Sequence, residues 1–387
     1  MEIARKEGKL RIAVVRQRYD AFGGAERFIA RAMPALEQLG TEVTVIARNW
    51  NGWGARQWLK IDPFFIGRTW RERSFARAAR AAWLSKGFDL VQSHERIPGC
   101  DVYRAGDGVH RRWLELRAAR ASITERLRLQ LSRYHRYLCR AEQELLEHPR
   151  LRAVICNSNM VRDEIRRGFR IAADKLHVIY GGVDLKHFHP ERRGALRGPA
   201  RAELGVHQRD TAFLFVGSDY ARRGLDTAID ALALTGSKNF WLLVLGRDEN
   251  EPRFVQQASR AGLRERVRFL GTREDIRPLY AAADCLVLPS RYDPFPNAAL
   301  EALAMGLPVV VSERSGAAEV VRSGENGWVC KPDDMAGLAR LMHDTDRAMR
   351  DDRMQQAARR SAERYGLEEA NQQFAEIYAK LAARGSY

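Results

Sequence analysis

Short apolar runs alternate with helical patterns along almost the whole chain. This alternation predicts parallel α/β units, in which a helix returns the chain to the same edge of a sheet after each strand. Since 387 residues exceed what one typical core accommodates, we expect two domains, each built on one doubly wound parallel sheet. The predicted strands are Leu10–Arg16, Thr41–Ala47, Phe88–Ser93, Ala153–Asn157, Ala212–Gly217, Trp241–Gly246, Val267–Gly271, Cys285–Pro289 and Pro308–Ser312.

The boundary between the two domains is predicted near residue 185. Residues 175–190, followed by an Arg/Gly/Pro-rich stretch to residue 200, are typical of a hinge. We therefore expect a first domain over residues 1–185 and a second over residues 186–367.

Positive charge is concentrated in the first of these domains. The formal net charge of the chain is +16. Residues 1–190 contain 36 basic and 21 acidic residues, a net of +15, whereas the remainder contains 29 and 28. Such an imbalance indicates an anionic partner: a membrane surface, an acidic glycolipid or a nucleic acid.

The sequence offers no convincing metal site, and we expect no cofactor. The five cysteines are an odd number without paired metal-ligand spacing, which is typical of a reducing compartment. Asp344 and Asp346 lie two positions apart in a predicted helix and so do not share a face. The first fifteen residues are charged and lack a long apolar run, and no segment approaches the roughly 20 apolar residues that span a bilayer. We therefore expect a cytoplasmic or peripheral protein without a signal peptide.

Two carboxylates flank a predicted helix start in the second domain. Cys285–Pro289 is a predicted buried strand whose exit loop carries Asp293, and a helix begins near Asn297 and contains Glu301. The N–H groups of the helix start, at Asn297 and Ala298, favour an anion such as phosphate. The two acids are suited to hydroxyls instead. Either acid alone would more often be a solvated side chain, but together with the helix start they predict a nucleotide-sugar site.

This stretch, DPFPNAALEALAMG, resembles the E-x7-E region of the family 4 glycosyltransferases, which are retaining enzymes of the GT-B fold. It departs from the usual pattern at Asp293, where Glu is common, and at Pro296, where Gly is common. The resemblance implies two Rossmann-like domains that face an interdomain cleft, with the last helix, residues 368–387, returning to the first domain. It also implies that Glu301 holds the nucleotide ribose and that Asp293 holds hydroxyls of the donor sugar.

Two further elements of the predicted donor site follow the first strand of each domain. Gly23 and Gly24 precede a helix, where glycines let backbone N–H groups approach an anion. This pair matches a phosphate-contacting loop in the resembled family. Arg222 and Arg223 follow the first strand of the second domain and are predicted to clamp a diphosphate leaving group. Arg273, in a later strand-end loop, is predicted to lie near the donor, although the sequence gives no readable code for the base.

Three residues at strand ends of the first domain are candidates for the acceptor site. His94, Asp107 and His110 occupy positions that face the ligand crevice in doubly wound folds. We favour Asp107 as a ligand of an acceptor hydroxyl and as a candidate base. For His94, a structural role in the core is as compatible with the sequence as acceptor binding. The resemblance implies a front-face mechanism, in which the departing phosphate helps to deprotonate the acceptor.

A basic segment over residues 111–140 contains nine Arg against two Glu. Its apolar residues recur at helical spacing, which predicts one amphipathic helix with arginines around it. That helix either packs on its own domain with a solvated basic face or lies on an anionic leaflet. The charge of the first half favours the second interpretation, with the inner membrane as partner. The apolar residues of this stripe are Leu116, Ile123, Leu127, Leu131, Tyr134, Leu138 and Leu145.

Further short motifs resemble the lipopolysaccharide-core glucosyltransferases within the same family. They are Phe22-Gly23-Gly24, Pro98-Gly99-x-Asp101-Val102-Tyr103 and Gly217-Ser218-Asp219. The resemblance implies a metal-independent transfer of glucose from UDP-glucose to an anionic glycolipid at the cytoplasmic face of the inner membrane.

Three other classes remain to be distinguished. A GT-B-like nucleotide-sugar epimerase would share fold and donor but would need no acceptor. A basic nucleic-acid-binding protein is less favoured, because no recognised nucleic-acid module accompanies the arginines, and no nucleic-acid partner is expected. A dinucleotide-dependent dehydrogenase is disfavoured because neither half has G-x-G-x-x-G after its first strand.

Overall fold

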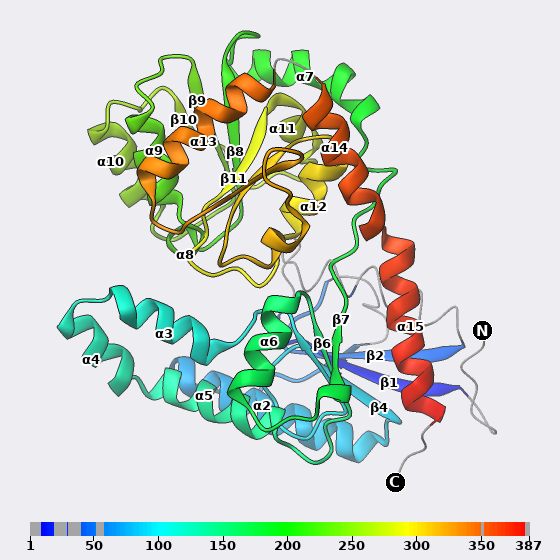
Figure 1. The fold of residues 1–387 in the computed structure, drawn as a ribbon. Helices are drawn as coiled ribbons and strands as arrows, with labels where there is room; N and C mark the ends of the chain where they lie inside the picture. Colours follow the sequence, from blue (N-terminus) through cyan, green and yellow to red (C-terminus); the bar gives the residue numbers. More distant parts are fainter. Residues whose placement is uncertain (1–8, 19–28, 30–39, 52–57, 350–351, 384–387) are drawn as a thin grey trace. The chain divides into compact units, whose positions relative to one another are not determined.

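The computed structural model describes residues 9–18, 29, 40–51, 58–349 and 352–383. The chain divides into two compact units, unit 1 with Met1–Tyr180 and Ala370–Tyr387, and unit 2 with Gly181–Glu369. Each unit contains one parallel sheet with helices on both faces (Figure 1). The predicted fold class, two Rossmann-like doubly wound domains, is therefore confirmed.

The sheet of unit 1 has the order β3-β2-β1-β4-β5-β6-β7 among the described residues. Its strands are β1 Leu10–Val15, β2 Thr41–Ala47, β3 Trp58–Lys60, β4 Leu90–Ser93, β5 Val102–Ala105, β6 Ala153–Cys156 and β7 Leu176–Val178. Its helices are α2 Gly67–Lys86, α3 His110–Arg120, α4 Ile123–Leu131, α5 Arg133–Leu146, α6 Asn159–Gly168 and most of α15 Leu367–Ala383.

The two faces of this sheet bury different helices, because side chains along a strand alternate between faces. Ile12 and Val14 of β1 belong to a core that includes Phe374 and Tyr378 of α15. Ala13 and Val15 belong to the opposite core, which contains buried side chains of α2, α5 and α6. Figure 1 shows α15 beside β1 and β2.

The sheet of unit 2 has the order β10-β9-β8-β11-β12-β13. Its strands are β8 Thr211–Val216, β9 Phe240–Leu245, β10 Val267–Phe269, β11 Cys285–Leu288, β12 Val309–Ser312 and β13 Gly327–Cys330. Its α-helices are α7 Pro190–Leu204, α8 Tyr220–Arg223, α9 Leu225–Leu234, α10 Glu251–Arg260, α11 Arg277–Ala282, α12 Asn297–Ala304, α13 Met335–Ala348 and α14 Arg353–Ala362.

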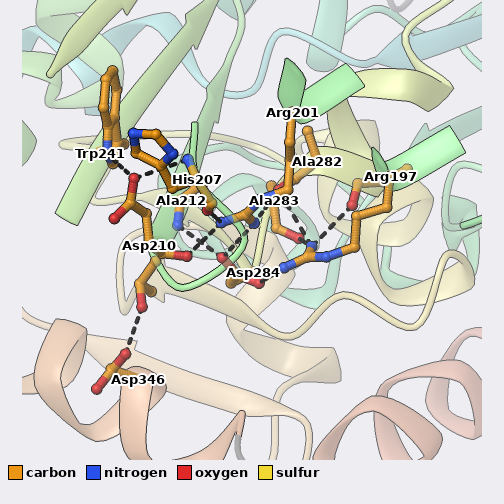
Figure 2. A network of polar contacts seen from close by, with 12 residues as sticks. Arg197, Arg201, His207, Asp210, Ala212, Trp241, Ala282, Ala283, Asp284 and Asp346 are labelled. Atoms are coloured by element: carbon orange, nitrogen blue, oxygen red, sulfur yellow. Dashed lines mark hydrogen bonds and ion pairs between the residues drawn. The ribbon is translucent and has the colours of Figure 1, made fainter. Parts of the chain in front are cut away.

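A buried ionic network fixes the amino ends of β8 and β11 (Figure 2). Asp284, just before β11, accepts hydrogen bonds from Arg197 at 2.6 Å, from Arg201 at 3.2 Å and from the backbone N–H of Ala212 at 2.8 Å. Arg201 is fully buried and also donates to backbone carbonyls, including that of Ala282. Helix α7 is thereby joined to the centre of the sheet.

The prediction of one long amphipathic helix over the basic segment is wrong. The segment forms three helices, α3, α4 and α5, with breaks at Ala121 and Ser132. Ser122 and Ser132 start the next helices by accepting hydrogen bonds from backbone N–H groups, as N-cap serines do. Leu116, Leu138 and Leu145 of the predicted stripe are buried, whereas Ile123, Leu127 and Leu131 are exposed.

Candidate active site

Each sheet reverses its strand order beside its first strand. In unit 2, β9 lies on one side of β8 and β11 on the other; in unit 1, β2 and β4 flank β1 in the same way. Ligands of open α/β sheets bind outside the carboxyl ends of strands at such a switch point. The loops that leave β8 and β11, and those that leave β1 and β4, therefore define one candidate site in each unit.

In unit 2 the switch point brings Arg223 and Asp293 together. Arg223 follows β8 and Asp293 follows β11, and Arg223 Nη1 lies 3.1 Å from Asp293 Oδ2. Asp293 is buried, with only 6% of its surface exposed, so the guanidinium is its principal charge compensation. Gly217 allows this approach, because a Cβ there would lie 2.5 Å from Arg223 Nε and its φ is +139°.

Arg222 lies beside this pair and is oriented by Tyr292. Its Nε donates to the carbonyl of Tyr292 at 3.0 Å, and its guanidinium lies 5.3 Å from the centre of the Tyr292 ring. Helix α8 begins at Asp219, whose carboxylate accepts from the Arg222 N–H at 3.3 Å. Both arginines that the sequence predicts therefore lie at the carboxyl end of β8.

Glu301 and the start of α12 complete the unit 2 cluster. Helix α12 begins at Asn297, followed by the buried Ala298, and no side chain caps its first N–H groups. Glu301 is buried one turn inside the helix, where its Oε2 accepts from the Tyr280 hydroxyl at 2.9 Å. Gly181 contacts the same helix start, since a Cβ at that position would lie 2.4 Å from Asn297 Oδ1.

The structure does not place two predicted donor-site features, Arg273 and the Gly23-Gly24 pair, in this cluster. Arg273 pairs with Glu203 of α7 at 3.5 Å, with about half of its side chain exposed. Gly23 and Gly24 lie outside the described residues. Their predicted roles in donor binding stay predictions.

In unit 1 the switch point opens into a pocket of about 280 Å³. Arg16, after β1, lies 3.4 Å from Glu95, after β4, as measured between Nη1 and Oε1. Helices α2 and α5 supply the wall opposite these strand ends. The pocket is lined by Arg16, Gln17, Arg18, Arg71, Glu72, Phe75, Ala76, Glu95, Arg96, Ile97, Asp107, Tyr134, Tyr137 and Leu138. Arginines, carboxylates and tyrosines around one hollow suit a ligand that carries both hydroxyls and negative charge.

The three predicted acceptor residues occupy different environments. Asp107 is exposed and lines the pocket. His110 begins α3, where its N–H donates to the buried Glu142 at 2.8 Å and its Nε2 lies 3.2 Å from His135 Nδ1. His94 is buried, and its Nε2 lies 2.8 Å from the Gln92 amide nitrogen.

Burial shifts the two titratable groups at the end of β4 in opposite senses. It raises the pKa of Glu95, although Arg16 and the Gln17 N–H oppose this shift. It lowers the pKa of His94 well below its usual value, and Arg16 and Arg104 lower it further. His94 is therefore a neutral acceptor for the Gln92 amide, whose oxygen accepts from the Tyr378 hydroxyl of α15.

Among the residues whose placement is described, no three His, Cys, Asp or Glu side chains are grouped to hold a metal ion. Asp344 pairs with Arg347, while Asp346 accepts from the Thr211 hydroxyl. Within the same ranges, none of the helices has the length and apolar character required to traverse a bilayer.

Each of the two units matches a protein-family model. Residues 197–364 match the model of the glycosyl transferases group 1, and residues 22–187 match that of Glycosyltransferase Family 4. Together the two matches cover most of the chain. The chain belongs to the family 4 glycosyltransferases. It is therefore a transferase, as its sequence predicts.

Individual relatives of this family 4 glycosyltransferase align over most of its length. It is 26% identical to the lipopolysaccharide glucosyltransferase WaaG of Escherichia coli over 82% of this chain and 84% of that protein. It is 25% identical to the lipopolysaccharide core biosynthesis glycosyltransferase LpsE of Rhizobium meliloti, over 83% and 84%. These relatives favour transfer over the epimerase alternative.

Solved structures support the same fold. A crystal structure of WaaG covers 95% of this chain and 99% of its own, with 24% identity and a TM-score of 0.81. A structure of Anabaena HepE in complex with UDP-glucose covers 96% of this glycosyltransferase and 100% of its own chain, with 22% identity and a TM-score of 0.71. Both confirm the GT-B assignment.

Several residues of the two clusters were not predicted from the sequence. Tyr280 and Tyr292, which orient Glu301 and Arg222, lie outside the recognised motifs: Tyr280 is on α11, and Tyr292 directly precedes Asp293. Arg16 and Glu95 could have been found, because each directly follows a strand at the switch point of unit 1.

Proposed function

We propose that this glycosyltransferase moves a hexose from a nucleotide-sugar to a lipopolysaccharide-core or related surface glycolipid, with retention of configuration. The cluster at the switch point of unit 2 carries the proposal. Arg222 and Arg223 offer two cations to a diphosphate, while Asp293 and Glu301 offer two buried carboxylates to hydroxyls. The activities for which WaaG and LpsE are named support the glycolipid acceptor, and both proteins align over most of the chain.

UDP-glucose is the proposed donor. WaaG is named a glucosyltransferase, and UDP-glucose is bound in the HepE structure. In this chain Glu301 would accept from the ribose hydroxyls, held in place by Tyr280. Asp293 would accept from hydroxyls of the sugar. Because Asp293 also compensates Arg223, it would orient the cation that faces the diphosphate.

The proposed reaction breaks the bond between sugar C1 and the diphosphate oxygen and forms a bond from C1 to an acceptor oxygen. Arg222, Arg223 and the first N–H groups of α12 would stabilise the charge that develops on the leaving diphosphate, so the step is proposed to need no metal. The acceptor proton would pass to a phosphate oxygen of the departing group on the same face of the sugar. Retention of configuration follows from that front-face geometry.

The acceptor is proposed to bind in the pocket of unit 1. Asp107 lies on its rim and would accept a hydrogen bond from an acceptor hydroxyl. Arg16, Arg18 and Arg71 supply positive charge for an anionic glycan, and Tyr134 supplies an aromatic surface. His94 and His110 would contribute indirectly to acceptor binding, through their contacts with Gln92 and Glu142.

The membrane contact is proposed to be made by α3, α4 and α5, the helices of the basic segment. Their arginines would meet anionic headgroups, each nearby basic side chain adding about 1 kcal/mol. The enzyme would then work as a peripheral protein on the cytoplasmic face of the inner membrane.

A donor panel tests the proposal directly. Purified protein in EDTA is titrated with UDP-glucose, UDP-galactose, UDP-N-acetylglucosamine, GDP-mannose and ADP-heptose, and thermal stabilisation and sugar release are followed. We expect a response to UDP-glucose without added metal. A response that appears only with a divalent cation would contradict the metal-independent mechanism, and a response to another donor would replace UDP-glucose.

Variants of the unit 2 cluster test the residue roles. Arg222→Ala and Glu301→Ala should each lower transfer by about 10²–10³-fold, the usual cost of one charge-stabilising group. Glu301→Gln, which keeps an acceptor for Tyr280, separates the loss of charge from the loss of packing. Arg264→Ala removes an exposed arginine of the same unit and serves as the matched control. Unchanged turnover in folded Arg222→Ala would remove that residue from the mechanism.

A further inference from the structure

Phe64, Ile66 and Trp70 expose a large apolar surface on unit 1. Their exposed fractions are 73%, 69% and 48%, and the rings of Phe64 and Trp70 stack edge to face at 5.6 Å. Single exposed apolar side chains are ordinary, but several in so short a segment indicate a contact surface. The basic segment discussed above does not include these residues.

The exposure of these side chains is fixed by the structure beneath them. Burial alternates over residues 61–66: residues 61, 63 and 65 are half-buried, and residues 62, 64 and 66 are exposed. The buried Arg48 donates to Asp62 at 2.7 Å and to the carbonyl of Pro63 at 2.9 Å. Its guanidinium also lies 4.7 Å from the centre of the Phe65 ring. Arg48 thus anchors the segment through Asp62, the Pro63 carbonyl and the Phe65 ring, while Phe64 and Ile66 are exposed.

Helix α4 exposes a second apolar surface of the same kind. Ile123, Leu127 and Leu131 are spaced four residues apart, so they share one face. Their exposed fractions are 85%, 54% and 62%, whereas Leu129 on the other side of the helix is buried. Helix α4 therefore buries Leu129 on one side and exposes its three apolar residues to solvent on the other.

Each of the two surfaces lies within a few residues, along the chain, of a contact between the first turns of α2 and α5. The guanidinium of Arg68 lies 4.5 Å from the centre of the Tyr134 ring. Ile66 precedes Arg68 by two residues and Leu131 precedes Tyr134 by three, so both apolar surfaces border this contact. A span of three residues reaches at most about 11 Å.

Exposed arginines are frequent on the helices that carry or adjoin the two apolar surfaces. They include Arg68, Arg73, Arg120, Arg126, Arg128, Arg133 and Arg136. Apolar side chains set among arginines, with a tryptophan beside them, match the headgroup region of an anionic bilayer, where charge and apolar contact act together.

We propose that Phe64, Ile66 and Trp70 form a second membrane-inserting element, which enters the same anionic leaflet as the exposed face of α4. This inference rests on the proposed function, since it assumes a lipid-linked acceptor. Tyr134 lines the acceptor pocket and also contacts Arg68, which lies two residues after Ile66. A glycolipid anchored in that leaflet would therefore present its polar part close to the pocket.

Vesicle binding by the full chain tests the proposal. Phe64→Ser/Ile66→Ser should lower partitioning onto phosphatidylglycerol-containing vesicles by about tenfold or more, because inserted apolar surface is lost. Leu84→Ser, which removes an equally exposed apolar side chain from the last turn of α2, should bind as the unsubstituted chain does. Trp70→Phe should still bind but should show less quenching of tryptophan fluorescence by brominated acyl chains.

Several results would overturn this element. The first is unchanged binding by Phe64→Ser/Ile66→Ser together with lost binding by Ile123→Ser/Leu127→Ser. The second is an equal loss of binding by Leu84→Ser, and the third is unchanged quenching in Trp70→Phe. Self-association of the unsubstituted chain that Phe64→Ser/Ile66→Ser abolishes would assign the patch to a second copy. Binding is measured without donor or acceptor, and transfer to a delipidated acceptor glycan is measured separately. A failure of the proposed function would appear only in the second assay.

Discussion

Units 1 and 2 place the same kind of ion pair at the same topological position. In unit 1, Arg16 after the first strand lies 3.4 Å from Glu95; in unit 2, Arg223 after the first strand lies 3.1 Å from Asp293. In both sheets the carboxylate comes from the strand across the reversal of strand order. The surroundings differ. Arg222 and the start of α12 adjoin the pair of unit 2 along the chain, whereas the pair of unit 1 borders a pocket lined by further arginines and by tyrosines.

This difference separates what the fold determines from what the loops determine. Two doubly wound sheets bring an arginine and an acid together at their switch points. The neighbouring loops then decide whether the site suits a compact diphosphate or an extended glycan with hydroxyls and charge.

The largest effect is expected at Asp284, which fixes the amino ends of the strands that carry the unit 2 pair (Figure 2). Asp284→Ala leaves Arg201, which is fully buried, without its carboxylate. The free energy of unfolding of unit 2 should fall by about 3–5 kcal/mol, the usual cost of breaking a buried pair. Denaturant unfolding measures the lost stability, and native-state hydrogen exchange shows which of the two units has lost it.

The matched control is Asp344→Ala, which removes a carboxylate from an exposed pair with Arg347 on the same unit. Exposed pairs contribute about 0–1 kcal/mol. Equal losses in the two variants would show that the Asp284 network does not stabilise the sheet as its burial indicates.

The next effect distinguishes the two switch-point pairs by kinetics. Arg223→Ala should lower kcat by about 10²–10³-fold, because it removes a charge from the leaving-group site. Arg16→Ala should instead raise the KM for the acceptor by about tenfold while kcat and the KM for the donor change little. If Arg16→Ala lowered kcat as strongly as Arg223→Ala, the assignment of separate roles to the two pairs would be wrong.

Periodicity in the sequence was sufficient for the fold class but not for all of its strands. Thr41–Ala47 alternates polar and apolar residues before an apolar end and was predicted with its observed bounds. Strands β3, β5, β7 and β13 were missed; all are only three or four residues long, and all but β5 are half-buried in part. The split of the basic segment into three helices was missed because the apolar spacing continues across Ser122 and Ser132. These serines cap the next two helices.

The candidate site was accessible from the sequence only where residues lie in motifs. Asp293, Glu301, Arg222 and Arg223 occur at recognisable spacing; the structure pairs Arg223 with Asp293 and buries Glu301 in α12, the helix that follows β11. Tyr280 acts from another helix, twenty-one positions before its partner Glu301. Such a contact depends on tertiary packing, which local spacing does not encode.

The smallest effect is expected at Glu95, whose carboxyl in unit 1 has its pKa raised, chiefly by burial. Below the ordinary glutamate pKa of about 4.3, folded and unfolded chains both hold this proton. As the pH rises, the unfolded chain releases it first, so the contribution of Glu95 to stability is lost as the pH passes through the raised pKa. Glu95→Gln should remove this decline from the pH dependence of the free energy of unfolding of unit 1.

The effect of Glu95 must be measured against the unsubstituted protein, because titration of His94 changes stability with pH in the opposite direction. Its pKa is lowered, chiefly by burial, so its contribution to stability is lost as the pH falls below the ordinary histidine value of about 6.5. The two slopes partly cancel where their pH ranges overlap, and only the difference between Glu95→Gln and the unsubstituted chain isolates Glu95. Glu144→Gln, an exposed site on α5, is the control. Parallel pH profiles for Glu95→Gln and Glu144→Gln would mean that the unit 1 carboxylate, despite its arginine partner and its burial, titrates as an ordinary surface group.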